Sequence, residues 1–348
     1  MQKSNVIGID LAKNVIQVCV ISKEGELVSN KAVSPKKLKE LLTKMKPAVV
    51  AMEGCSACHY WGRFAQQLSH EVRIISPRKV KAFLQGQKTD ANDALAVAVA
   101  AMQIGMVFSQ LKSKEQQILQ SIESSRKFLD KQLVSLTNHM RAYLSEYGIT
   151  SARGKKGFTQ LITHALDDCP DSSSELPGCL VPALHTMWER YTQTLVQITE
   201  LEKQRRLLMK PSEPCQRLIE LEDVGEVCAT MLFSNLGDGK GFKNGRQASA
   251  YVGVTPKQYS SGGKVSIRGI DKAGGNKELR AALFQGAMSV IISLPDNPKT
   301  TKQAWLIALI SRVGIKRACI AYANKTVRTA WALLSTGQHY QKTPISVN

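Results

Sequence analysis

The first hundred residues alternate between short apolar runs and helical patterns, and this alternation constrains the fold more than any other feature of the chain. Helical spacing of apolar residues is found at Lys36–Met45, at Tyr60–Leu68 and from about Thr89 or Asp90 onward. The predicted order β-β-β-α-β-α-β-α indicates an α/β domain built on a mixed sheet. The runs predicted to be strands are Val6–Asp10, Val15–Val20, Leu27–Val33, Ala48–Met52 and Val72–Ile75.

From about Gln110 the pattern becomes purely helical. Two long amphipathic stretches, 118–147 and 184–208, predict helices that form an antiparallel arm or a dimer contact, and packing inside one chain explains the stripes equally well. The stretch between them, 151–179, is predicted to be a connection, since it is rich in Gly, Pro and Ser.

Pro211 and Pro214 mark the start of a third part. Its helical patterns are interrupted by a polar, basic, glycine-rich segment, Thr255–Gly275, which is predicted to be a loop. The fold class expected for the whole chain is therefore α/β plus all-α. We expect an α/β domain at 1–108, a coiled-coil-like helical arm at 109–212 and a mainly helical domain at 213–348.

The charge balance predicts an anionic partner. Lys and Arg number 47 against 28 Asp and Glu, a formal net charge of +19. Such an excess favours binding to a polyanion, because each neutralised phosphate releases condensed counterions. A membrane surface is also anionic, but the longest uncharged stretch, Ala94–Leu111, contains Gln, Gly and Ser and fits a buried helix better than a membrane span. We therefore expect no membrane association. The first residues lead directly into a predicted strand without a secretory signal, so we expect a cytoplasmic, nucleoid-associated protein.

Four carboxylates lie at ends of the predicted elements of the first domain. Asp10 ends the first strand, Glu53 follows the buried strand, and Asp90 and Asp93 are three residues apart at a helix start. Taken singly, Asp90 could be a helix cap and Asp10 a turn residue. Together they predict a site for Mg²⁺, which prefers oxygen ligands and supports phosphodiester chemistry in pairs of ions. The element order resembles that of ribonuclease-H-like nucleases, which carry such a site.

A second candidate site is the segment Tyr259-Ser260-Ser261-Gly262-Gly263-Lys264. A serine hydroxyl can attack a phosphodiester where cations stabilise the developing charge, and glycines let the backbone approach a phosphate closely. A flexible loop without a catalytic role explains the same residues. The cations that would supply the positive field and contact nucleic acid are Lys264, Arg268, Lys272 and Arg280.

Both halves resemble one family, the DEDD insertion-sequence transposases, whose characterised members are bridge-RNA-guided serine recombinases. The resemblance covers nearly the whole chain and rests on short blocks in a fixed order. The amino-terminal blocks are Gly8–Lys13, Met52-Glu53-Gly54 and Lys88–Ala94; the carboxy-terminal blocks are Ala248–Pro256, Tyr259–Gly262 and Lys272–Arg280.

The resemblance implies a RuvC-like domain whose DEDD set, here Asp10, Glu53, Asp90 and Asp93, binds Mg²⁺. The family serine follows a tyrosine by two residues and precedes a glycine, which matches Ser261 and not Ser260. The implied reaction forms a covalent phosphoserine with DNA, followed by strand exchange and religation.

The implied partners are DNA at the element ends and target, a structured noncoding guide RNA, and further copies of the chain. The family implies a homo-oligomer, a dimer or a tetramer, in which one protomer's carboxylates meet another's serine. Base pairing of the RNA would read the DNA sequence while the protein holds the backbones.

Two positions depart from the family pattern. Glu222-Asp223-Val224-Gly225 stands where a Pro-Gly-Ile-Gly-type helix-hairpin-helix turn is common, which puts a DNA-binding hairpin there in doubt. Asp271 stands where a serine or threonine is common. Neither departure touches a candidate catalytic position.

Two other functions fit parts of the pattern. A metal-dependent nuclease resembling Holliday-junction resolvases would hydrolyse DNA with the carboxylates alone, so Ser261 would be dispensable. A non-catalytic nucleic-acid-binding scaffold would keep its biological activity after Asp10→Ala or Glu53→Ala, which a mobility assay in cells measures.

The charge excess makes a first prediction. Affinity for nucleic acid should fall steeply as salt is added, because much of the binding free energy comes from counterion release. The measurement is a series of binding titrations at increasing salt concentration. A flat response would show that the basic residues do not form the binding surface.

Overall fold

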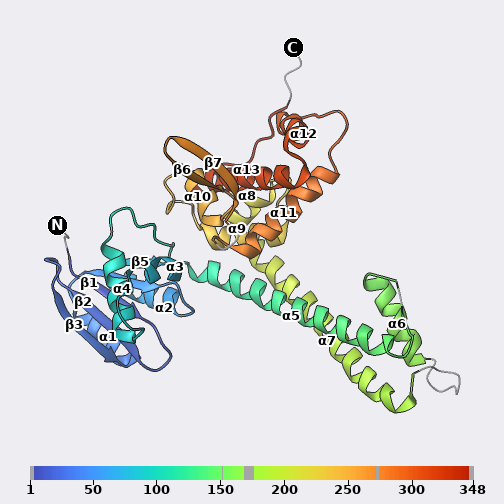
Figure 1. Cartoon of the computed structure of the whole chain (residues 1–348), viewed down its shortest axis with the longest axis horizontal. Helices are drawn as coiled ribbons and strands as arrows, with labels where there is room; N and C mark the ends of the chain where they lie inside the picture. Colours follow the sequence, from blue (N-terminus) through green and yellow to red (C-terminus); the bar gives the residue numbers. More distant parts are fainter. Residues whose placement is uncertain (1–3, 151, 168–175, 272–273, 345–348) are drawn as a thin grey trace. The chain divides into compact units, whose positions relative to one another are not determined.

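A computed structural model describes residues 4–150, 152–167, 176–271 and 274–344 (Figure 1). The chain divides into two compact units. The first comprises Met1–Gln116 and Asn235–Ala248, and the second comprises Gln117–Ser234 and Ser249–Asn348. The three-part division expected at residues 108 and 212 stays a prediction.

The first unit is built on a five-stranded mixed sheet, as predicted. The strands lie in the order β3-β2-β1-β4-β5. The pairs β1–β2 and β2–β3 are antiparallel, whereas β1–β4 and β4–β5 are parallel. The strand bounds are β1 Val6–Asp10, β2 Ile16–Ile21, β3 Leu27–Val33, β4 Val49–Glu53 and β5 Glu71–Ile75.

Helices cover both faces of this sheet. Helices α1 (Pro35–Lys44) and α2 (Cys58–Gln67) pack against the apolar residues of one face, including Ile7 and Ile9 of β1. The short α3 (Pro77–Val80) and a 3₁₀ turn (Lys81–Phe83) lead to α4 (Asp90–Met102). Helix α4 packs against the other face. The central strands are therefore buried on both sides, in agreement with the apolar run from which β4 was predicted.

Two long helices form the antiparallel arm predicted from the sequence. Helix α5 (Lys114–Ser145) and α7 (Val181–Met209) run side by side in opposite directions (Figure 1). Met140 and Leu144, near the end of α5, share a core with Leu184 and Tyr191, near the start of α7.

The segment predicted as a connection between these helices contains a helix of its own, α6 (Lys155–Asp167), and a 3₁₀ turn at Gly178–Leu180. Phe158, Leu161, Ile162 and Ala165 repeat at helical spacing and are buried against α5 and α7. The sequence analysis did not predict this helix, because its short apolar pattern lies among glycines and serines that are typical of a loop. Residues 151 and 168–175 of this segment lie outside the described part of the chain.

The rest of the second unit is mainly helical. Helices α11, α12 and α13 share a core of buried apolar residues around Tyr322. The helices after the arm are α8 Glu213–Ile219, α9 Glu226–Leu236, α10 Gly245–Val252, α11 Lys277–Ile292, α12 Thr301–Val313 and α13 Ile315–Thr336, of which the end of α9 and the first half of α10 belong to the first unit. None of the helices in the described ranges is both long enough and apolar enough to span a membrane.

The predicted loop at 255–275 is in fact a β-hairpin over most of its length. Strand β6 (Pro256–Ser261) pairs antiparallel with β7 (Lys264–Ile270). The two residues between them, Gly262 and Gly263, have φ of 54° and 77°, as a type I′ hairpin turn requires. The glycine pair that suggested flexibility therefore makes a tight turn.

Asp223, in the turn where the sequence departs from the family pattern, is buried between α8 and α9. The Thr326 hydroxyl on α13 donates to its carboxylate at 2.5 Å. Its carbonyl oxygen also lies 2.1 Å from where a Cβ on Gly286 would be, so α11 approaches this turn closely. Asp223 thus links the turn to α13 by a hydrogen bond, and the turn packs closely against α11 at Gly286.

A buried ionic network joins three helices of the second unit. Arg205 of α7 is 3% exposed and contacts Glu123 of α5 at 3.4 Å and Glu226 of α9 at 3.0 Å. Glu123 is 4% exposed and also pairs with Arg126 at 2.8 Å. Buried charges of this kind depend on their partners, because water cannot replace a lost contact.

We predict that Glu123→Ala lowers the free energy of unfolding by about 3–5 kcal/mol, the usual loss when one partner of a buried ion pair is removed. Chemical denaturation followed by circular dichroism measures the change. The control is Glu189→Ala, whose side chain is 60% exposed beside His185, so a loss below about 1 kcal/mol is expected. Equal losses in the two variants would contradict a special role for the buried network.

Candidate functional site

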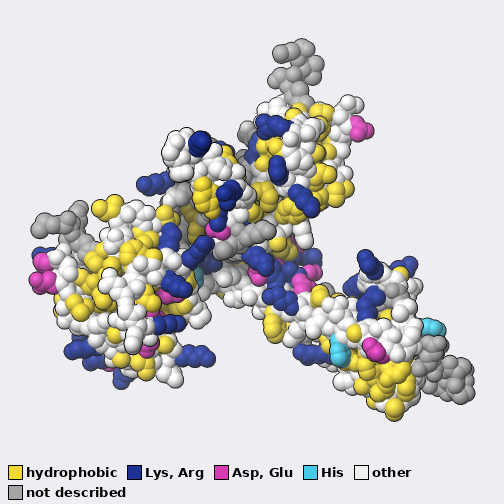
Figure 2. Space-filling view, viewed as in Figure 1, with side chains coloured by type: hydrophobic (Ala, Val, Ile, Leu, Met, Phe, Trp, Pro, Cys, Tyr) yellow, Lys and Arg dark blue, Asp and Glu magenta, His cyan; other side chains and the backbone are white. Residues whose placement is uncertain are grey.

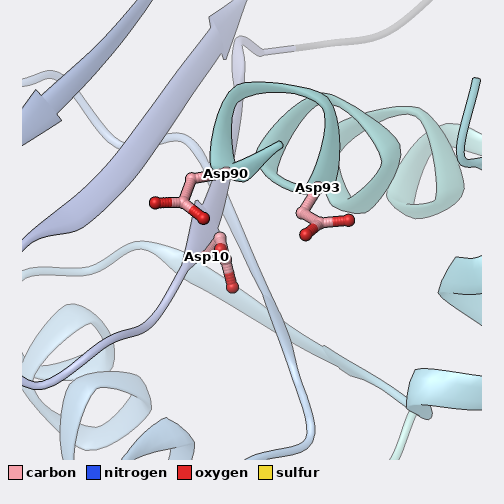
Figure 3. A group of neighbouring side chains, drawn as sticks. All are labelled: Asp10, Asp90 and Asp93. Atoms are coloured by element: carbon pink, nitrogen blue, oxygen red, sulfur yellow. The ribbon is translucent and has the colours of Figure 1, made fainter. Parts of the chain in front are cut away.

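Three of the predicted carboxylates come together on the first unit. Asp10 is the last residue of β1, and Asp90 and Asp93 lie in the first turn of α4 (Figure 3). Each offers an oxygen within 4.8 Å of an oxygen from the other two. Asp10 and Asp93 are half-buried, whereas Asp90 is exposed.

Strand periodicity explains why Asp10 faces α4. Side chains alternate between the two faces of a sheet, and Val6 packs on the α4 side while Ile7 and Ile9 pack on the α1–α2 side. Asp10 is in phase with Val6 and Gly8, so it points toward the α4 side. There it meets the first turn of that helix.

Glu53 lies beside this trio. Strand β4 is the parallel neighbour of β1, and the register Ile9↔Met52 places Asp10 and Glu53 at the next position of their strands. Glu53 is in phase with Ala51, which packs on the α4 side. Burial raises the pKa of Glu53, and the negative charges of Asp10 and Asp93 raise it further. The structure therefore groups three of the predicted acids tightly and sets the fourth within their electrostatic reach.

The cluster is electrostatically unfavourable without a cation. Burial raises the pKa of Asp10, the charges of Asp93 and Asp90 raise it further, and Lys88 opposes this only in part. The repulsion among these carboxylates opposes folding at neutral pH. A divalent cation would offset it, and the all-oxygen donor set suits a hard ion.

The start of α4 is defined by Thr89, not by Asp90. The Thr89 hydroxyl accepts a hydrogen bond from the backbone nitrogen of Asn92 at 3.3 Å, as an N-cap residue does. The Asn92 amide donates to the Gln87 carbonyl at 2.7 Å. Asp90 is therefore not needed as the cap, and its carboxylate is available to the cluster.

Gly8 allows α4 to lie directly on β1. A Cβ at this position would be 2.4 Å from the carbonyl oxygen of Ala94 and 2.6 Å from the nitrogen of Ala98. The glycine and the alanine-rich face of α4 together bring the first turn of the helix over Asp10. Sequence reasoning missed Gly8 and Thr89 as supports of the site, although a glycine inside an apolar strand is a signal of close backbone approach.

Ser261 is the last strand residue before the hairpin turn, directly opposite Lys264. Both residues are exposed. Two residues further along the strands, Tyr259 pairs with Ser266, so these side chains lie on the same face as Ser261 and Lys264. The guanidinium of Arg268 lies 5.1 Å from the centre of the Tyr259 ring. One face of the hairpin therefore carries Ser261, Lys264 and Arg268.

The opposite face of the hairpin differs in character. Ser260 pairs with Val265, and Gln258 pairs with Ile267. Val265 and Ile267 are 62% and 71% exposed. The two adjacent serines thus point to opposite sides, Ser261 with the cations and Ser260 with the apolar residues.

The two remaining predicted cations are placed differently. Arg280 is 8% exposed, and its guanidinium donates to the Gly274 carbonyl, so this side chain holds the loop that precedes α11. That position favours a structural role over direct contact with a phosphate. Lys272 lies outside the described residues.

The repulsion in the cluster leads to a prediction for the cation-free protein. In the presence of a chelator at neutral pH, Asp10→Asn should raise the melting temperature, because it removes a charge that the folded state disfavours. Each kcal/mol gained corresponds to about 2–4 °C. Differential scanning calorimetry measures the shift.

The matched control is Asp238→Asn in the same unit, which neutralises an exposed carboxylate 3.8 Å from Lys240. We expect it to leave the melting temperature nearly unchanged. A fall in melting temperature for Asp10→Asn would contradict the repulsion inferred at the cluster.

Two family models match the chain. The IS110-type DEDD family model, described as a transposase, matches residues 7–149, and the model described as "Transposase IS116/IS110/IS902 family" matches residues 215–303. The first match covers the residues of the carboxylate cluster and the second covers the serine hairpin.

Curated relatives match over nearly the full length. The transposase for insertion sequence element IS1111A of Coxiella burnetii is 35% identical over 98% of this chain and 92% of its own length. The transposase for insertion sequence element IS1328 of Yersinia enterocolitica is 33% identical over 98% of this chain and 100% of its own. A pilin gene-inverting protein of Moraxella bovis is 23% identical over 97% of each chain.

These matches confirm the expectation of an insertion-sequence transposase, an enzyme whose substrate is DNA. They do not favour the hydrolytic alternative. With the carboxylate cluster and both domain matches in place, the chain belongs to the IS110 family of transposases.

Proposed function

We propose that this transposase cleaves and rejoins DNA through a covalent phosphoserine at Ser261, with Mg²⁺ held by Asp10, Glu53, Asp90 and Asp93. The observation that carries the proposal is the convergence of three of these acids within 4.8 Å, at the ends of a strand and a helix. Such a cluster is costly to the fold unless it holds a cation. Its place inside the DEDD domain match supports a role in phosphodiester chemistry.

The residues of the cluster fit a hard divalent ion. All candidate ligands are carboxylate oxygens, and the exposed Asp90 leaves one side open to a phosphodiester. When bound, the ion would polarise the phosphodiester and stabilise the charge that develops on its oxygens. The contribution of the chain is to hold Asp10 on β1 against Asp90 and Asp93 on α4.

Ser261 is suited to nucleophilic attack by its position. Its hydroxyl oxygen would form a bond to phosphorus as the bond from phosphorus to the leaving sugar oxygen breaks, and the serine proton would pass to the solvent or the leaving oxygen. Lys264 and Arg268, on the same face, would hold the non-bridging oxygens. The number of phosphate ester bonds is conserved, so a hydroxyl of another strand can reverse the step and rejoin the DNA.

The proposed partners follow from charge and from the resemblance of the motifs. Lys and Arg side chains lie on the visible surface of each unit and suit the backbones of DNA and of a structured noncoding guide RNA (Figure 2). We also propose a homo-oligomer, a dimer or a tetramer, in which the serine of one protomer serves the carboxylates of another.

The test of this function is the covalent intermediate. Ser261→Ala should abolish a protein–DNA adduct that survives denaturing electrophoresis, while affinity for DNA stays within about twofold, since only a hydroxyl is lost. The assay uses the full-length protein with DNA containing element ends, the guide RNA and Mg²⁺. Ser260→Ala is the matched control, because it removes the same group one residue away on the other face of the hairpin.

The outcomes separate the candidate functions. An adduct that persists in Ser261→Ala would mean that another residue is the nucleophile. Cleavage by Ser261→Ala without any adduct, yet dependent on Asp10, would favour hydrolysis by the carboxylates alone.

A further inference from the structure

The first turn of α4 is tied to the sheet by a side chain from another strand. Asn30 of β3 donates a hydrogen bond from Nδ2 to the carbonyl oxygen of Ala91 at 2.8 Å. Ala91 lies between Asp90 and Asp93 in the same turn. The bond therefore acts on the backbone that carries both acids.

A second hydrogen bond orients Asn30. Gln17 of β2 donates from Nε2 to the Oδ1 of Asn30 at 2.7 Å. Gln17 is itself the cross-strand partner of Asp10 in the register of β1 and β2. The two bonds thus connect the neighbourhood of Asp10 on the sheet to the turn that carries Asp90 and Asp93.

The two hydrogen bonds from Gln17 to Asn30 and from Asn30 to Ala91 form a relay, and its last acceptor sets its direction. A carbonyl oxygen can only accept, so Asn30 must present its NH₂ group to Ala91 and its oxygen to Gln17. Gln17 must then present its own NH₂ group. Each amide has one productive orientation, which makes the pair a rigid spacer.

Strand periodicity places both amides on the α4 side. Gln17 lies between Ile16 and Val18, which pack on the opposite face, and Asn30 pairs with Cys19, which packs on the α4 side. Both amides are half-buried, and their two hydrogen bonds offset part of the cost of removing them from water.

We propose that Asn30 and Gln17 are positioning residues for the cation site, holding the first turn of α4 at the distance from β1 that lets Asp10, Asp90 and Asp93 share one ion. The inference rests on the proposed function of the cluster. Residues that orient metal ligands without touching the metal commonly change metal affinity by about 10- to 100-fold when they are removed.

The other end of α4 offers a matched control. Arg73 of β5 donates from Nη1 to the carbonyl oxygen of Ala101 at 2.6 Å, the same kind of tether between the sheet and the helix backbone. Ala91 and Ala101 are ten positions apart, a rise of about 15 Å along the helix. Loss of this tether should weaken the packing of α4 without moving the acids.

The experiment measures Mn²⁺ binding to the full-length protein by electron paramagnetic resonance, with Mn²⁺ as a hard, oxygen-preferring probe. Asn30→Ala should raise the dissociation constant for Mn²⁺ about tenfold or more. Gln17→Ala should also raise this dissociation constant, but by a smaller factor. This second variant provides the test if Asn30→Ala does not fold. Arg73→Gln should lower the melting temperature and leave Mn²⁺ affinity unchanged.

Asn30→Asp separates positioning from charge. It keeps the acceptor for Gln17 but replaces the donor to Ala91 with an oxygen that repels the carbonyl. The added negative charge would strengthen Mn²⁺ binding if charge alone determined affinity. The positioning role requires weaker binding in this variant.

The results distinguish failure of this inference from failure of the proposed metal site. If the wild-type protein shows no saturable Mn²⁺ binding that Asp10→Asn removes, the metal site itself is wrong. If the wild type binds through Asp10 but Asn30→Ala and Gln17→Ala bind equally well, the relay has no positioning role. Equal weakening in Asn30→Ala and Arg73→Gln would also overturn it, since general loosening of α4 would then explain the loss.

Discussion

The close packing of α4 on β1 is the contact on which the candidate site depends. Gly8 has no side chain and the alanines of α4 have small ones, so the helix backbone packs directly against the backbone of the strand. Asp10 ends that strand and Asp90 and Asp93 begin that helix. A larger residue at Gly8 would separate the two elements and, with them, the carboxylates. Packing and chemistry are therefore set by the same interface.

The same interface stores electrostatic repulsion. Asp10 and Glu53 have raised pKa values because they are partly buried and face other acids. The fold tolerates this because the cap at Thr89 and the hydrogen bond from Asn30 hold the first turn of α4 in place against the repulsion. A bound divalent cation would neutralise this repulsion and thereby stabilise the folded unit. This connects the stability of the first unit to the proposed chemistry of the family.

The serine hairpin follows a different principle. Its strands are exposed on both faces, so burial does not assign roles to its residues. The strand register determines which residues share a face. It places Ser261 on the same face as Lys264, Tyr259 and Arg268, and Ser260 on the other face with Val265 and Ile267. An isolated two-stranded hairpin has little stability of its own. The positive-φ glycines of its turn therefore matter for keeping the serine in place.

For the first unit the sequence by itself predicted the order of the strands and helices, the mixed sheet and carboxylates at the element ends, because apolar periodicity and element ends are local properties. It also pointed to the family through short blocks such as Lys88–Ala94. The cap at Thr89 and the tight turn at Gly262-Gly263 are local features that the sequence pattern contained but that were not predicted. Tertiary structure alone decided that Arg280 is buried and that α4 lies directly against Gly8. It also decided that Asn30 reaches Ala91 across 61 residues of sequence. These features depend on which segments meet in space, and a local pattern carries no record of such distant partners.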